Sequence, residues 1–71
     1  MTTTNEMIAI QTHRESSTWY AFADSGEMIA TSCGPNSLAS EIGYALDDRG
    51  MSEALLNGRI CTAAELKNQG W

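Results

Sequence analysis

The segment from Pro35 to Gly50 constrains the fold of this chain more than any other. Its apolar residues Leu38, Ile42 and Leu46 recur every four residues, and Ala45 falls beside them. This spacing places all four side chains on one side of an α-helix, with the charged and polar residues mainly on the opposite side. The sequence therefore predicts an amphipathic helix that covers another layer of the protein.

Both ends of this segment have residues that are typical of helix ends. Pro35 suits the first turn, because its missing N–H would have no partner there. Asn36 or Ser37 is expected to cap the free amides, and Gly50 to close the last turn in a left-handed conformation. Gly43 lies in the middle, where glycine costs about 1 kcal/mol relative to alanine. Close approach of the helix to the sheet or to a partner would explain it, and chance is the alternative.

Three short segments before the helix are rich in apolar and β-branched residues and predict strands. They span residues 6–12 (EMIAIQT), 18–23 (TWYAFA) and 27–32 (EMIATS). Residues 13–17 (HRESS) are polar and predict a turn, and Asp24-Ser25-Gly26 predicts a compact hairpin loop. Because sequential strands joined by short loops normally pair as antiparallel neighbours, we expect a three-stranded meander.

The alternation of residues along these strands predicts one face against the helix and one face away from it. We expect the inward face to carry Ile8, Ile10, Tyr20, Phe22 and Ile29. The other face would then carry Met7, Ala9, Trp19, Ala21, Ala23, Met28 and Ala30, with too few charges to be well solvated. The favoured explanation is that the C-terminal segment, with Leu55, Leu56, Ile60 and Trp71, folds back over this face. The alternative is a contact surface for a partner or for a second copy of the chain.

The C-terminal third supports two interpretations. In one, Ser52 caps a short helix that Gly58 stops; in the other, Asn57-Gly58 is a tight turn between two short strands. The helix is slightly favoured, because Ser-Glu-Ala-Leu-Leu suits a helix and the strands would be very short. Thr62 and Glu65 then have the spacing of a capping box, which predicts a further turn or two of helix.

Together these segments predict one α+β domain covering residues 1–71. It consists of a three-stranded antiparallel β-meander packed against one principal α-helix, in the order β-β-β-α, with a short, partly helical C-terminal region. Residues 1–4 are expected to be a frayed tail. A chain of 71 residues buries a small core, so a stability of only a few kcal/mol is expected.

Charge limits the classes of partner. The chain has nine acidic and four basic residues, which gives a formal net charge of −5. Such a chain lacks the clustered Lys and Arg that phosphate backbones and anionic membranes attract, so neither nucleic acid nor a membrane is an expected partner. A basic protein is the expected partner, and a second copy of the chain, which would form a homodimer, is the alternative.

Few residues are suited to catalysis or metal binding. His13 is the single histidine, and Cys33 and Cys61 are the two cysteines, too few for a disulfide-built secreted module. The N-terminal residues MTTTNEM do not resemble a signal peptide, and no apolar run is long enough to cross a membrane. We therefore expect a cytoplasmic protein with reduced thiols and with neither cofactor nor metal; a disulfide between Cys33 and Cys61 is the alternative, because sequence does not give the separation of their Cα atoms.

Cys33-Gly34-Pro35, between a predicted strand and the predicted helix, resembles the active-site turn of thioredoxin. The resemblance implies a nucleophilic thiol at Cys33. It ends at Asn36, which stands where the second cysteine belongs, so dithiol chemistry is absent. A thiol enzyme is accordingly the third-ranked functional hypothesis.

Two groups of residues are candidates for protein binding. Trp19, Ala21 and Met28 lie on the strand face that is expected to point away from the helix, and Trp is enriched at binding hot spots. Glu41, Asp47 and Asp48 form an acidic patch towards the end of the helix. The alternatives are a sheet face covered by the chain itself and an acidic patch that is only solvated.

Two families share general features with this chain. The β-β-β-α order, the Asp-x-Gly turn at residues 24–26 and the L-x-x-x-I-x-x-A-L helix at residues 38–46 resemble HicB-type antitoxin domains. That resemblance implies a regulatory oligomer, although the chain lacks their additional DNA-binding segment. Size, charge and architecture are also similar to small acidic proteins of phages and mobile elements, including anti-CRISPRs. The sequence hypothesis is therefore a non-enzymatic inhibitor or modulator that docks on a larger basic protein.

Overall fold

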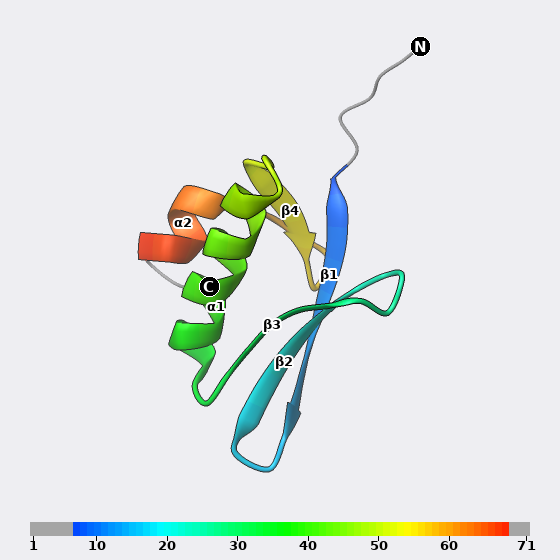
Figure 1. Ribbon diagram of the computed structural model, residues 1–71, viewed down its shortest axis with the longest axis vertical. Helices are drawn as coiled ribbons and strands as arrows, with labels where there is room; N and C mark the ends of the chain where they lie inside the picture. The colour runs from blue at the N-terminus through cyan, green and yellow to red at the C-terminus, as the bar shows by residue number, and fades with distance from the viewer. Residues whose placement is uncertain (1–6, 69–71) are drawn as a thin grey trace.

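Five strands of this protein form one sheet, and two helices lie on one side of it (Figure 1). The computed structural model describes residues 7–68. The elements are β1 (Ile8–Glu15), β2 (Thr18–Ala23), β3 (Met28–Ser32), α1 (Pro35–Asp48), β4 (Glu53–Leu56), β5 (Arg59–Thr62) and α2 (Ala63–Asn68). The strand order is β3-β2-β1-β4-β5, so β1 is the central strand, between β2 and β4, and β3 and β5 form the two edges. The predicted α+β class is confirmed.

The first three strands form the predicted antiparallel meander. β1 pairs with β2 from Ile10↔Ala23 to Glu15↔Thr18, and β2 pairs with β3. The turn between β1 and β2 is shorter than the predicted loop over residues 13–17. Only Ser16 and Ser17 lie between the paired ends, and Ser16 has a φ of +58°.

Helix α1 is confirmed, but its N-terminal cap is not the predicted one. Pro35 is the first helical residue, so Gly34 occupies the cap position and no side chain caps the helix. The prediction that Asn36 or Ser37 provides the cap is wrong, because both already lie within the first turn. At the other end, Gly50 has a φ of +72°, as predicted, and its N–H donates to the carbonyl of Asp47 at 3.0 Å.

The segment from Glu53 to Thr62 is a β-hairpin, so the slightly favoured helix interpretation is wrong. Asn57 and Gly58 form its turn with φ values of +52° and +85°, the left-handed conformations that a tight two-residue hairpin turn requires. β4 is also parallel to β1, with Ile8 opposite Ala54 and Ile10 opposite Leu56. This long-range pairing satisfies the strand's backbone groups, which outweighs the local helix preference.

The capping box that begins α2 is confirmed. The Thr62 N–H donates to Glu65 Oε1, the Glu65 N–H donates to Thr62 Oγ1, and both distances are 3.1 Å. α2 lies against α1 at Gly43. A Cβ built on Gly43 would lie 2.9 Å from the Ala63 carbonyl oxygen, so the absent side chain makes room for α2.

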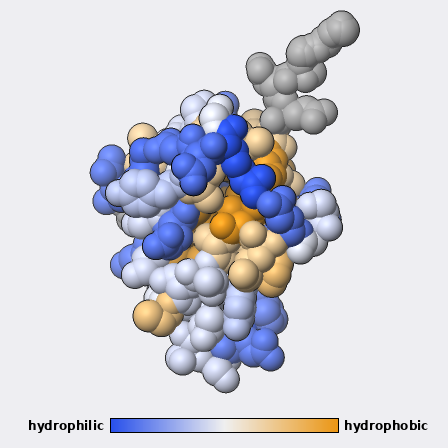
Figure 2. Space-filling view, in the orientation of Figure 1, coloured by the Kyte–Doolittle hydropathy of each residue, from blue (hydrophilic) through white to orange (hydrophobic). Residues whose placement is uncertain are grey.

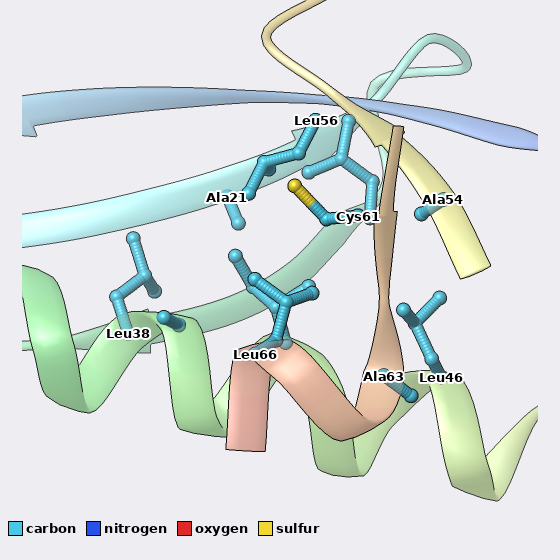
Figure 3. Close-up of a cluster of buried hydrophobic side chains, with 11 residues drawn as sticks. Ala21, Leu38, Leu46, Ala54, Leu56, Cys61, Ala63 and Leu66 are labelled. Atoms are coloured by element: carbon cyan, nitrogen blue, oxygen red, sulfur yellow. The ribbon is translucent and has the colours of Figure 1, made fainter. Parts of the chain in front are cut away.

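The core lies between the sheet and the two helices (Figure 3). Leu38 and Leu46 of α1, and Leu66 of α2, point towards Ala21, Leu56 and Cys61 of the sheet. The cluster of buried residues comprises Ile10, Ala21, Leu38, Ala39, Ile42, Leu46, Ala54, Leu56, Cys61, Ala63 and Leu66. The predicted inward positions of Ile8, Ile10 and Ile29 are confirmed, since Ile10 is 1% exposed and the other two pack against the cluster.

The predicted orientation of β2 is wrong. Ala21 and Ala23 share the face of Ile10 and are buried, whereas Tyr20 and Phe22 alternate to the opposite face. The cause is the two-residue turn, which pairs even-numbered residues of β1 with odd-numbered residues of β2. The small alanines then lie beneath α1, and the large aromatic rings lie outside.

The C-terminal segment does not fold back over the opposite face of the sheet. β4 and β5 extend the sheet sideways, and α2 packs against α1 and β5 on the helix side. Neither α1 nor α2 has the length and the apolar character needed to cross a bilayer. The predictions for Trp71 and for the tail at residues 1–4 concern positions outside the described residues.

Candidate protein-binding surface

The sheet face away from the helices, here called the open face, has no second layer over it within residues 7–68. Strand alternation and register place Tyr20 and Phe22 of β2 on it, with Leu55 of β4 and Ile60 of β5. The rings of Tyr20 and Phe22 are stacked, with centroids 6.0 Å apart. Ile60 is 58% exposed. The open face thus carries an aromatic pair on β2 and aliphatic side chains on β4 and β5, with Gln11 and His13 of the central strand β1 between them.

An irregularity in β3 adds Met28 to the open face. Ala21 pairs with Ala30 but Phe22 pairs with Met28, so Ile29 is an extra residue in β3. Ile29 and Ala30 both pack against the core, and Met28 lies beside Phe22 with 50% of its surface exposed. The bulge therefore extends the apolar area of the open face to the β3 edge.

Charge is divided between the two faces of the sheet. The charged residues of the strands are Arg14, Glu15, Glu53 and Arg59. Glu15 and Glu53 alternate to the open face, whereas Arg14 pairs with Trp19 and Arg59 pairs with Leu56 on the helix side. The open face consequently has acidic residues at opposite ends and no Lys or Arg from any strand. In Figure 2 the most hydrophobic surface in view lies over β1 and β4, bordered by hydrophilic residues.

The residues predicted for protein binding do not form one surface. Met28 lies on the open face, as predicted. The predicted position of Ala21 is wrong, because Ala21 is 0% exposed beneath the helices and is closed to any partner. Trp19 lies on the same helix-side face as Ala21, because it is two residues away from Ala21 along β2. It is half-buried and packs against the core.

The predicted acidic residues lie on the helix layer. Glu41, Asp47 and Asp48 are exposed on α1. Asp47 makes an ion pair with Lys67 of α2, and the Lys67 ammonium also lies 5.5 Å from the centre of the Tyr44 ring. Asp47 therefore helps to join the two helices, whereas the structure assigns no ion pair within residues 7–68 to Glu41 or Asp48.

A hollow of about 390 Å³ lies on the helix side of the sheet. Its lining residues are Thr12, Trp19, Leu56, Asn57, Arg59 and Cys61. The helices leave it open because α1 lies over β2 and β3 while α2 lies against α1 and β5. No motif in the sequence points to Thr12, Asn57 or Arg59 as site residues; the local signal for this region is the Asn-Gly turn.

The residues considered for chemistry lie apart. Cys33 is exposed at the junction of β3 and α1, Cys61 is buried in the core, and both are free thiols. His13 is exposed and alternates to the open face. Residues 7–68 contain no group of three or more His, Cys, Asp or Glu side chains that could hold a metal ion.

Comparisons with protein-family models, curated proteins and solved structures found no match to this chain.

Proposed function

We propose that this chain is a non-enzymatic cytoplasmic binding protein that docks through the open face on a basic surface of a larger protein. The observation that carries the proposal is the open face itself. Tyr20, Phe22 and Met28 form an apolar area on β2 and β3, and Leu55 and Ile60 add a second one on β4 and β5. Ala9, Gln11 and His13 of β1 lie between the two areas, and no layer covers this face in the described part of the chain. Tyr20 and Phe22 are half-buried and Met28 is exposed, and aromatic and methionine side chains are enriched at the centre of protein interfaces.

Charge supports a basic partner. Glu15 and Glu53 border the apolar area, both strand arginines point to the other side, and the whole chain has a formal charge of −5. An apolar centre with an acidic border complements a surface rich in Lys and Arg, such as a nucleic-acid-binding surface. Occupying that surface would make the chain an inhibitor or modulator of the partner. An origin in a phage or mobile element, as in anti-CRISPRs, is the further proposal that size and charge support.

The experiment begins with affinity purification from the source organism, using the wild-type chain, Tyr20→Asp and Tyr44→Asp. Tyr44 is 60% exposed on α1 and provides a matched control, because the same substitution there leaves the open face unchanged. A partner that fits the proposal is retained by wild type and Tyr44→Asp and lost with Tyr20→Asp. Titration of the purified partner then identifies the interaction as direct, and far-UV circular dichroism verifies that both variants are folded.

Salt dependence and oligomeric state provide the decisive outcomes. A docking interaction between acidic and basic surfaces weakens as ionic strength rises from about 0.05 to 0.3 M, since the Debye length falls over that range. Equal retention by wild type and Tyr20→Asp would contradict the proposal. Sedimentation of a wild-type dimer that Tyr20→Asp converts to monomers would instead favour the HicB-like oligomer, the alternative function.

A further inference from the structure

The hollow on the helix side combines an aromatic wall with guanidinium groups. Trp19 and Leu56 supply apolar lining, and Arg59 lines the hollow at its β5 border. The Arg14 guanidinium carbon lies over the Trp19 ring, 5.9 Å from its centre, so a second positive charge lies next to the aromatic side of the hollow. The volume of about 390 Å³ falls within the usual range for small-molecule sites.

Neither arginine is paired with an acidic side chain in the described part of the chain, although Arg14 lies over the Trp19 ring and donates to the Ser16 carbonyl. The two ion pairs among residues 7–68 are Arg49 with Glu27 and Lys67 with Asp47, so neither Arg14 nor Arg59 has an acidic partner there. Among residues 7–68 no acidic side chain lines the hollow, and the strand acids Glu15 and Glu53 point to the open face. This region is therefore locally positive on an acidic protein.

The hollow is also held in shape by hydrogen bonds. Asn57 accepts from the Thr12 N–H at 3.0 Å and donates to Thr12 Oγ1 at 2.9 Å, which fixes the β4–β5 turn against β1. Arg14 Nε donates to the Ser16 carbonyl at 3.1 Å, which restricts the Arg14 side chain near Trp19. These hydrogen bonds hold the β4–β5 turn and the Arg14 guanidinium in place before any ligand binds.

We propose that this hollow binds a planar organic anion: an aromatic ring that carries a carboxylate or phosphate group. The ring packs on Trp19, and the anionic group binds Arg59 and Arg14, whose planar guanidinium groups match carboxylate and phosphate oxygens in pairs. This site is separate from the proposed docking function, because it lies on the opposite side of the sheet.

The test is an NMR titration of the full-length, ¹⁵N-labelled chain with phenyl phosphate, benzoate, inorganic phosphate and phenol. The Trp19 indole N–H signal is assigned by its persistence in Trp71→Phe. We expect phenyl phosphate, benzoate or both to shift this signal, with an affinity on the order of tenfold above that of phenol or inorganic phosphate alone. The two ring-bearing probes distinguish a phosphate ligand from a carboxylate ligand.

Variants separate the proposed site from general charge effects. Arg59→Ala is expected to weaken binding on the order of tenfold, because it removes a charge-assisted hydrogen-bonding group. Arg49→Ala removes the same charge from a residue paired with Glu27 elsewhere, and Tyr20→Asp changes only the open face; both are expected to bind like wild type. The remaining amide signals verify the fold of each variant. Absence of a Trp19 shift up to about 10 mM probe, or equal affinities for Arg59→Ala and Arg49→Ala, would overturn the proposal.

Discussion

Asn57 is the residue whose replacement tests the arrangement of this fold most directly. Its backbone N–H donates to the Ile10 carbonyl at 2.8 Å, and its side chain makes two hydrogen bonds with Thr12. Its φ of +52° is a conformation that non-glycine residues other than Asn and Asp adopt rarely. One side chain therefore supports the turn and also joins the hairpin to the middle of the sheet.

We expect Asn57→Ala to lower the free energy of unfolding by about 2–3 kcal/mol. The two side-chain hydrogen bonds are exposed, and their loss contributes about 1–2 kcal/mol together. The left-handed backbone adds about 1 kcal/mol, because alanine has a Cβ that disfavours it. For a chain of this size, where about 3–5 kcal/mol is the usual total, this change removes about 40% of the stability or more.

Two further variants separate these contributions. Asn57→Gly keeps the left-handed backbone free of strain and loses only the hydrogen bonds, so a loss of about 1–2 kcal/mol is expected. Asn36→Ala is the matched control, since Asn36 is exposed and provides no helix cap; its effect is expected to stay within about 0.5 kcal/mol.

Urea denaturation followed by far-UV circular dichroism measures all three variants, with an unchanged m-value showing that the unfolding transition is comparable. If Asn57→Ala is as stable as Asn36→Ala, the hairpin does not depend on these contacts. If Asn57→Gly loses as much as Asn57→Ala, the left-handed conformation contributes nothing and that part of the reasoning is refuted.

Four other substitutions have defined outcomes. Gly43→Ala should lower the thermal midpoint, with a loss of about 1–2 kcal/mol, because its Cβ would lie 2.6 Å from Lys67 Cγ and 2.9 Å from a backbone oxygen; a higher midpoint would contradict the close approach of the helices. Glu65→Ala should lose about 0.5–1 kcal/mol in urea denaturation and Glu65→Gln less, since glutamine can keep the capping box; equal losses would contradict this. Ser16→Gly should raise the urea midpoint, by up to about 1 kcal/mol in stability, because it relieves a φ of +58°; a fall would contradict strain there. Leu46→Asp should abolish cooperative unfolding, because it places an unpaired carboxylate at a position that is 0% exposed; a wild-type transition would contradict this burial.

The sequence predicted the elements whose signals are local. The four-residue spacing of Leu38, Ile42 and Leu46 identified α1, and the Thr62–Glu65 spacing identified the start of α2. These patterns predict structure because helix faces and helix caps depend on residues only three or four positions apart. The hairpin at residues 53–62 was harder to predict. The choice between hairpin and helix there depends on the pairing of β4 with β1, which lies more than forty residues earlier in the chain.

The candidate surface could be predicted only in part. Met28 was placed on the outer face correctly, but the orientation of β2 depended on the number of residues in the turn before it. A five-residue loop at residues 13–17 left the register undefined, and the large rings of Tyr20 and Phe22 favoured burial on grounds of apolar area alone. In the structure α1 lies over β2, where Ala21 and Ala23 leave room for its side chains.

The turn at Ser16-Ser17 therefore decides which chemistry each side of the sheet presents. It fixes Tyr20 and Phe22 on the same side as Glu15, and it brings Arg14 beside Trp19 on the other. A strand register shifted by one residue would exchange these sets, because side chains alternate with a period of two. The aromatic pair of the open face and the Arg14–Trp19 contact beside the hollow thus follow from this one turn, whereas Arg59 and Ile60 are placed by the β4–β5 hairpin.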